Sequence, residues 1–175
     1  TTGTNLFKDI FTGNQGSFPN NFTIFNNILF FEANDGINGT ELWKTDGTEL
    51  GTNMVINLNQ NGDGIYNSGF IESNNHLYFY ANDGIHGREL WKTDGTSSGT
   101  QLVKDINIGS SNSFNNKITG VSLNGLLYFV AYTPFYGYEL WKTDGTLQGT
   151  VLLKDISTGF EDGLPVYAEF ATLNN

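Results

Sequence analysis

Four aromatic residues form the most distinctive candidate site in this sequence of 175 residues. They are Tyr132, Phe135, Tyr136 and Tyr138, and two related segments of the chain carry mostly Asn, Asp, Ile or His at the matching positions. Aromatic rings with polar neighbours suit stacking on sugar rings, and loops are frequent binding surfaces. The sequence therefore indicates a carbohydrate- or protein-binding site, with packing against a neighbouring segment as the alternative.

Residues suited to catalysis are few. The chain has no Cys, and its two histidines, His76 and His86, fall in a predicted hairpin and a predicted loop. The sequence contains no serine elbow, zinc-binding pair or phosphate-binding glycine loop. A carboxylate pair for glycoside hydrolysis, Glu161 with Asp162 or with Glu72, is kept as an alternative. We therefore expect neither an enzyme nor a cofactor.

One segment resembles the start of a calcium loop. Residues 57–64 place oxygen-bearing side chains at alternate positions before a glycine. Carboxylates are missing at the first three ligand positions, and Ser68 stands where a bidentate Glu is required. The sequence therefore predicts no metal site of the helix-loop-helix type. A looser calcium site in this loop, at Asp35 or at Asp83 is kept as an alternative to an Asn- and Gly-rich turn.

A repeated octapeptide, Glu-Leu-Trp-Lys-Thr-Asp-Gly-Thr, determines how these residues are positioned. It occurs at residues 41–48, 89–96 and 139–146, so the three tryptophans of the chain are 48 and 50 residues apart. A period near 50 residues indicates a supersecondary unit that buries its apolar face by stacking on its neighbours. We expect a single repeat region, residues 1–175, with units at 1–50, 51–98 and 99–148 and a partial unit at 149–175.

The residues of the repeated motif are predicted to be structural. An indole in three equivalent strands favours packing over sugar stacking, which applies to Trp43, Trp91 and Trp141. An Asp before Gly-Thr favours a turn with a local side-chain bond, which applies to Asp46, Asp94 and Asp144. A second motif repeats a lysine, for which we expect a structural ion pair with the Glu of the octapeptide. The expected pairs join the lysines Lys8, Lys104 and Lys154 to the glutamates Glu41, Glu89 and Glu139.

Each unit is predicted to hold four antiparallel strands in a meander, in the first unit at residues 6–10, 22–25, 28–33 and 41–45. The second and third strands are joined by dipeptides that tolerate positive φ angles, namely Asn26-Asn27, Asn74-Asn75 and Asn124-Gly125. The third strand is apolar at consecutive positions, so both of its faces must be covered. The sequence therefore predicts an all-β, β-propeller-type array of four-stranded antiparallel blades in preference to a two-sheet sandwich.

Charge and composition bear on partners and location. With 18 acidic and 8 basic residues the net charge is −10, which argues against nucleic acid and anionic membrane surfaces. The sequence has no apolar run long enough to span a membrane as a helix. Abundant Asn, Gly, Thr and Ser with few basic residues favour an extracellular or cell-surface bacterial protein.

The octapeptide, followed by Gly-Thr, Leu and Lys-Asp-Ile, resembles the bacterial ELWxxDGT repeat family over three full copies and part of a fourth. The resemblance implies propeller-like β domains of large secreted or surface-attached proteins, with no general enzymatic activity. The sequence departs from the pattern at Ile56-Asn57 and at residues 133–137. We therefore expect a non-catalytic structural or adhesive binding module. A carbohydrate-binding, lectin-like propeller is the alternative, and a polysaccharide-acting enzyme comes third.

The predicted fourth unit contains two strands, at residues 151–156 and 167–173. Closed propellers have about four to eight blades, so about three and a half leave open edges. We therefore expect other blades of a longer chain, or other protomers, to complete a ring. A glycan or a surface protein is the other expected partner.

Overall fold

The computed structural model of the chain describes residues 3–114, 117–165 and 168–170. It contains three four-stranded antiparallel sheets, each with its strands in sequence order. No helix, and hence none able to cross a membrane, occurs in the described residues. The all-β prediction is confirmed. The strands are β1 (Asn20–Phe25), β2 (Ile28–Asn34), β3 (Thr40–Thr45), β4 (Asn53–Ile56), β5 (Ile71–Ser73), β6 (His76–Asn82), β7 (Arg88–Thr93), β8 (Gln101–Lys104), β9 (Gly120–Leu123), β10 (Leu126–Thr133), β11 (Gly137–Thr143) and β12 (Val151–Lys154).

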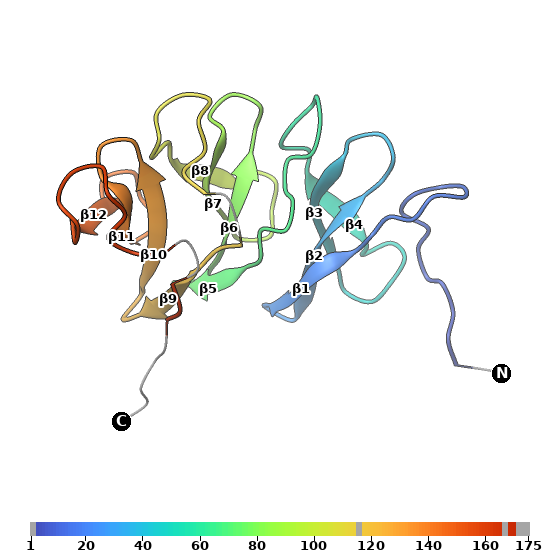
Figure 1. Cartoon of the computed structure of the whole chain (residues 1–175). Coiled ribbons are helices and arrows are strands. Elements are labelled where there is room, and N and C mark those ends of the chain that lie inside the picture. Colours follow the sequence, from blue (N-terminus) through green and yellow to red (C-terminus); the bar gives the residue numbers. More distant parts are fainter. Residues whose placement is uncertain (1–2, 115–116, 166–167, 171–175) are drawn as a thin grey trace.

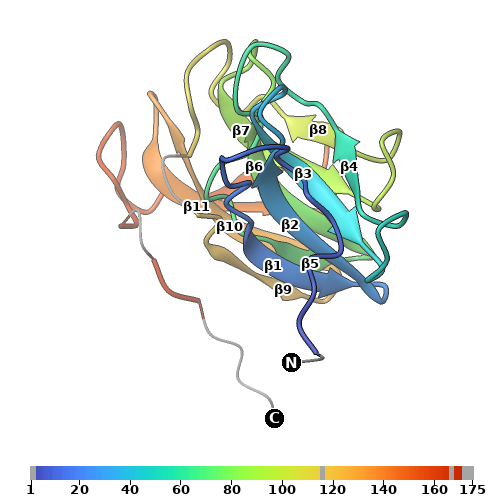
Figure 2. The same cartoon turned by 90° about the vertical axis from the view of Figure 1, so that its right-hand side faces the viewer.

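The three sheets follow one another in a row. Figure 1 shows β1–β4 beside the N-terminal segment, β5–β8 in the middle and β9–β12 at the far end. In the view turned by 90° the sheets lie one behind another, which shows that they are stacked (Figure 2). The first strands of the second and third sheets, β5 and β9, are joined by a hydrogen bond of 2.8 Å from the Ser122 hydroxyl to that of Ser73.

Two-residue turns join the first and second strands of every sheet, as the dipeptides predict. The residues on either side of each turn are paired, for example Phe25 with Ile28. All six turn residues have φ angles between 47° and 76°, the left-handed region that such turns require. They are Asn26, Asn27, Asn74, Asn75, Asn124 and Gly125.

The predicted assignment of strands to sheets is wrong by one strand. The strand after each Gly-Thr was expected to open a unit, but β4, β8 and β12 pair with β3, β7 and β11 and complete those sheets. Residues 151–154 therefore finish the third sheet and do not begin a fourth unit. Residues 6–10, expected to be a strand, form none. Most of the strand predicted at 167–173 lies outside the described residues.

The Asp-Gly-Thr turn explains this pairing, because it returns the chain to the strand it has just left. In the first sheet the Asp46 carboxylate accepts the Thr48 amide at 2.9 Å and the Thr48 hydroxyl at 2.7 Å. Across the turn the hydroxyls of Thr45 and Thr52 lie 2.7 Å apart in a buried pair. The second and third sheets repeat both contacts, with Asp94, Thr96, Thr93 and Thr100, and with Asp144, Thr146, Thr143 and Thr150.

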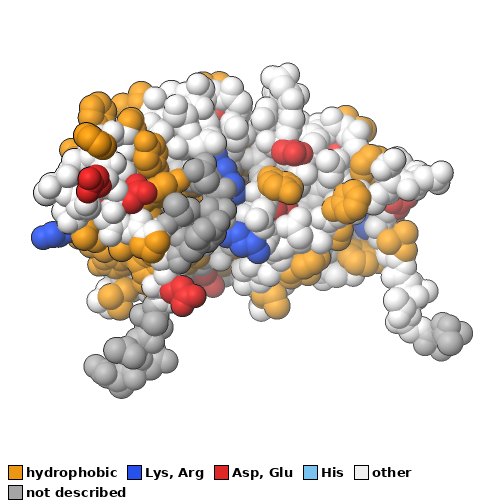
Figure 3. All heavy atoms as spheres, in the orientation of Figure 1, with side chains coloured by type: hydrophobic (Ala, Val, Ile, Leu, Met, Phe, Trp, Pro, Cys, Tyr) orange, Lys and Arg blue, Asp and Glu red, His pale blue; other side chains and the backbone are white. Residues whose placement is uncertain are grey.

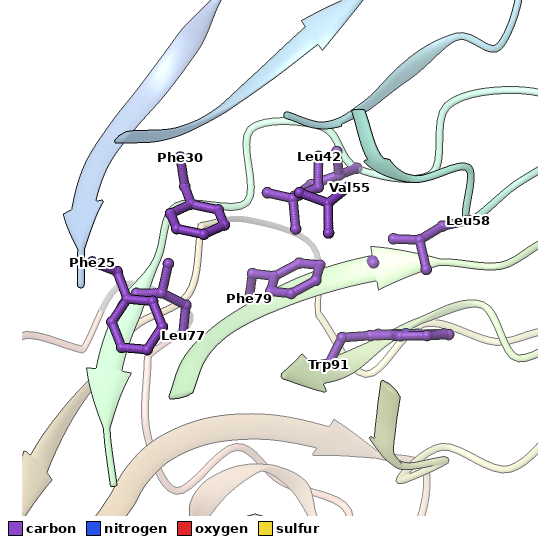
Figure 4. Packing of buried hydrophobic residues seen from close by; sticks show 10 residues of the cluster. Phe25, Phe30, Leu42, Val55, Leu58, Leu77, Phe79 and Trp91 are labelled. Carbon is purple, nitrogen blue, oxygen red and sulfur yellow. The ribbon is translucent and has the colours of Figure 1, made fainter. Parts of the chain in front are cut away.

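The second sheet packs one face on the first sheet and the other on the third. We call them the Trp face, which carries the Trp of the octapeptide, and the Leu face, which carries its Leu. Between the first and second sheets, Trp91 and Phe79 of one Trp face meet Leu42 and Val55 of the preceding Leu face (Figure 4). Leu58, from the segment that links the two sheets, lies beside the Trp91 ring.

The second junction repeats the first with equivalent residues. Trp141 and Phe129 of the third sheet pack on Leu90 and Val103 of the second. All three tryptophans of the chain are only 6–8% exposed. Their indole nitrogens are buried and have no hydrogen-bond partner within the described residues. The indoles therefore contribute to the structure through apolar contact.

A lysine bond accompanies the apolar packing at both junctions. Lys44 Nζ donates to the carbonyl of Gly95, in the Asp-Gly-Thr turn of the next sheet, and Lys92 Nζ does the same to Gly145, both at 2.8 Å. The turn lies directly on the preceding sheet, since a Cβ added to Gly95 would come within 2.9 Å of the Phe30 ring. Each junction thus combines apolar faces with charge-assisted bonds, and the second junction has a further one from Lys104 Nζ to the Thr150 carbonyl.

Replacing an indole at a junction is expected to destabilise the chain strongly. Trp91→Ala removes a buried ring between two sheets, and we expect a loss of about 3–5 kcal/mol in the free energy of unfolding. Denaturant titration followed by circular dichroism measures this loss. Phe135→Ala removes a ring that is 78% exposed, and it should change the free energy of unfolding by less than about 0.5 kcal/mol. Equal effects of the two variants would contradict the packing role.

Candidate functional site

Each sheet carries a fully buried glutamate from the octapeptide, which would be a candidate for acid-base chemistry if a substrate reached it. Glu41 accepts the backbone amides of Leu58 and Asn59 at 3.1 and 3.2 Å. Glu89 and Glu139 accept the amides 17 and 18 residues further along in the same way. In every sheet this carboxylate therefore anchors the segment that leaves the fourth strand.

The expected ion pairs between these glutamates and the repeated lysines are wrong. Lys104 Nζ donates to the Thr150 carbonyl at 2.8 Å and lies 5.9 Å from the centre of the Trp141 ring. Because the glutamates are enclosed by backbone amides, they are satisfied without a cation. In the part of the chain that the structure describes, the only ion pair joins His86 and Asp83.

Burial raises the pKa of Glu41 and of Glu89 to about 7, although the amide bonds oppose the shift. The Ser113 hydroxyl donates a further bond of 2.6 Å to Glu89. Both carboxylates have 0% exposure, and the Glu41 carboxylate fills the space that a side chain at Gly64 would need. These groups are therefore placed to hold backbone, with no opening to solvent beside them.

The carboxylates weighed as a glycosidase pair lie in different surroundings. Asp162, in the segment after β12, accepts the Tyr138 amide at 2.9 Å and so closes a backbone contact. Glu161 beside it is exposed, and Glu72 is exposed on β5 of the second sheet.

The residues weighed as calcium ligands act as turn caps. Although burial opposes it, the amides of Asn38 and Ile37 lower the pKa of Asp35. Asp83 caps the matching turn of the second sheet and pairs with His86 Nδ1 at 2.7 Å. In the loop at residues 57–64, Asp63 accepts the Thr40 amide. No group of three His, Cys, Asp or Glu able to hold a metal occurs among the described residues.

A hollow of about 540 Å³ on the surface contains two of the four predicted aromatic site residues. Tyr132 near the end of β10 pairs in register with Tyr138 near the start of β11. Their ring centres are 5.1 Å apart and their planes meet at 50°. The remaining lining residues are mostly small and polar, and they are Asn107, Ser110, Ser111, Asn112 and Pro134.

The other two predicted residues do not line this hollow. Phe135 and Tyr136 lie in the turn between β10 and β11, with exposures of 78% and 40%. The Tyr136 amide donates to the Thr133 carbonyl at 3.3 Å. The structure therefore brings Tyr132 and Tyr138 together and leaves Phe135 and Tyr136 on the turn beside them.

The polar wall of the hollow, in the segment that links the second and third sheets, is held by a bond within that segment and by a bond to β7. Asn112 Oδ1 accepts the Arg88 amide at 2.8 Å, and Asn107 Nδ2 donates to the Asn112 carbonyl at 3.0 Å. Ser110 and Ser111 lie between these fixed points and are exposed. No motif in the sequence predicts this wall. Its only signal was a run of Ser and Asn in a linker of otherwise unremarkable composition.

The tyrosine pair replaces polar pairs at the same place in the other sheets. The pair matching Tyr132 and Tyr138 is Asn82 with Arg88 in the second sheet and Asn34 with Thr40 in the first. The backbone is thus shared, and the aromatic lining is particular to the third sheet. This arrangement suits a flat ligand that stacks on a ring and hydrogen-bonds to hydroxyl and amide groups.

Comparisons with known proteins add little to this picture. No family model matches the chain, and no curated protein matches it. Among solved structures, an α-L-arabinofuranosidase from Clostridium thermocellum matches 79% of this chain with 16% sequence identity and a TM-score of 0.32. The chain spans about half, 49%, of that protein's length. A TM-score and a sequence identity this low assign neither a fold nor a function to this chain.

The two glutamates make stability depend on pH. Their ordinary pKa is 4.5, and in the folded chain it rises to about 7, so the folded state holds these protons more tightly. The stabilisation is complete below pH 4.5 and is lost as the pH rises through 7. The pKa of His86 is also raised, by its bond to Asp83, and acts in the same direction.

We therefore expect the free energy of unfolding to fall between pH 5 and pH 8, as measured by denaturant titration at fixed ionic strength. Glu89→Gln removes one titrating group and should make the slope shallower, whatever its effect on absolute stability. A free energy of unfolding that rises over this interval would refute the assignment.

Proposed function

We propose that this chain is a non-catalytic, propeller-type binding module that presents a carbohydrate site on a rigid stack of sheets. The hollow between Tyr132, Tyr138 and the 107–112 segment is the observation that carries this proposal. It is lined by two aromatic rings of the β10–β11 hairpin and by serine and asparagine side chains of the linking segment. Sugars have apolar ring faces and polar edges, so they match this combination of groups.

The propeller arrangement is supported by how the sheets are connected. Each sheet is a meander, and the fourth strands of the first and second sheets continue into segments that cross to the first strand of the next sheet. Successive sheets stack Trp face on Leu face at both junctions. This is the pattern of consecutive blades in a propeller.

A location outside the cell, or at its surface, completes the proposal. The net charge of −10 keeps such a surface soluble and unattractive to phosphate backbones. On the face seen in Figure 3, acidic and basic side chains are dispersed and form no continuous patch of one sign. The resemblance of the octapeptide to repeats of secreted bacterial proteins favours the same location.

A non-catalytic role is favoured over hydrolysis by the surroundings of the carboxylates. Glu41, Glu89 and Glu139 are committed to backbone amides, and Asp162 is committed to the amide of Tyr138. Among the described residues that line the hollow, none has a carboxylate. Binding by stacking and hydrogen bonds is the chemistry that this lining supports.

A glycan array followed by calorimetry on the best ligand tests the proposal. We expect Tyr132→Ala to weaken binding at least about tenfold, which corresponds to about 1.4 kcal/mol, because the ligand loses a stacking ring. Tyr136→Ala, on the neighbouring turn, reports whether a bound glycan extends beyond the hollow.

The matched control is Ile85→Ala, which removes an exposed apolar side chain from the equivalent turn of the second sheet. It should leave both binding and thermal unfolding unchanged. A blank array, or binding that survives Tyr132→Ala in a folded protein, would contradict the carbohydrate site. Release of reducing sugar from a bound polysaccharide would contradict the non-catalytic role.

A further inference from the structure

The outer faces of the first and third sheets carry the same residues that join the sheets inside the chain. On the Leu face of the third sheet, Tyr128 and Lys142 stand in the positions that Phe30 with Lys44, and Tyr78 with Lys92, hold at the two junctions. We propose that a second copy of this chain docks there head to tail, with its first sheet on the third sheet of its neighbour.

On the third sheet, apolar side chains that match buried ones at the internal junctions are exposed. Leu153 on β12 is 41% exposed, whereas the equivalent Val55 and Val103 are 7% and 4% exposed at the internal junctions. Ile156, which follows β12, is likewise 48% exposed, against 7% for the equivalent Ile106. The apolar row that is buried at both internal junctions is thus exposed to solvent on the third sheet.

The first sheet has the complementary surface on its Trp face, part of which the chain's own N-terminal segment covers, since Ile10 packs there and Trp43 is only 7% exposed. A hollow of about 330 Å³ is lined there by Leu29, Thr45 and Gly47, among others. At the internal junctions the turn glycine matching Gly47 lies against the Phe30 or Tyr78 side chain, but no described atom lies within 4 Å of a Cβ placed on Gly47. Apolar side chains also reach the surface towards the N-terminal end of the row in Figure 3.

The two faces also carry the donor and the acceptor of the polar contact found at the internal junctions. Inside the chain, a lysine of the Leu face donates to the carbonyl of the turn glycine on the next Trp face. Lys142 is the donor on the third sheet, and Gly47 supplies the carbonyl on the first. A second copy therefore provides what each face lacks, and the contact is heterologous, so it extends to a ring or a filament.

One segment must be exchanged for this contact to form. Residues 6–10, Leu-Phe-Lys-Asp-Ile, and residues 152–156, Leu-Leu-Lys-Asp-Ile, occupy the same place in the repeat. The receiving copy holds its own segment by Ile10, packed beside Trp43, and by the Ser17 carbonyl, which accepts the Asn34 amide at 2.9 Å.

The incoming copy can replace these contacts one for one. The Gly163 amide donates to the Tyr138 carbonyl, just as the Gly64 amide donates to the Thr40 carbonyl within the chain. The carbonyl of Gly64 then accepts the amide of Asn82 on the next sheet. The carbonyl of Gly163 is thus the natural acceptor for Asn34 of the second copy, and residues 3–17 of that copy give way.

Light scattering coupled to size exclusion tests the proposal at loading concentrations up to about 100 µM. We expect a mass of at least two chains, each of 19.3 kDa. Leu153→Glu places a charge in the apolar row and should give a monomer. Leu147→Glu adds the same charge on an exposed turn next to the sheet and should leave the multimer intact.

A pair of lysine variants separates docking from folding. Lys142→Ala should weaken association about tenfold and leave thermal unfolding of the monomer unchanged. Lys92→Ala removes the same bond from an internal junction, so it should lower the unfolding temperature and leave association in place. A wild-type chain that is monomeric throughout, or a multimer that Leu153→Glu does not dissociate, would overturn the proposal. Sugar binding is measured on the monomer and does not enter this result.

Discussion

Face-to-face packing of sheets that are apolar on both sides is the constraint on which the rest of the structure depends. Because Trp91 and Phe79 cover one face of the second sheet while Leu90 and Val103 cover the other, that sheet has no face to give to solvent. Burial of apolar area on both sides is the main source of stability for such a unit. The buried glutamates and junction lysines then fix how each sheet connects to its neighbour.

This constraint separates residues that cannot vary from those that can. The octapeptide supplies an indole, a carboxylate, a lysine and a turn to every sheet, and at the two internal junctions these groups contact the neighbouring sheet or the linker. At the hairpin ends the contacts that recur with the linkers are made by backbone amides, such as those of Thr40, Arg88 and Tyr138, so the side chains there can differ. Tyr132 and Tyr138 lie at one of these ends, where the first two sheets carry polar pairs. Rigid stacking thus provides the support, and the hairpin ends provide room for a binding surface.

The sequence predicted those features that local chemistry determines. Asn-Asn and Asn-Gly specify two-residue turns through their tolerance of positive φ, and consecutive apolar positions specify strands covered on both faces. The boundary of each sheet was missed because it depends on a contact across the turn, the buried hydroxyl pair of Thr45 and Thr52. The role of Glu41 was missed because its partners lie 17 and 18 residues away in a linker without a motif. The polar wall of the candidate site was missed for a related reason, since the fold of the linker between the second and third sheets positions it.

Acrylamide quenching of tryptophan fluorescence tests the packing role of the octapeptide most directly, because its three copies contain every tryptophan of the chain. The account predicts short-wavelength emission and little quenching in the native state, with both changing together when denaturant unfolds the chain. Native indoles that are quenched as readily as unfolded ones, or whose emission responds directly to added sugar, would contradict it.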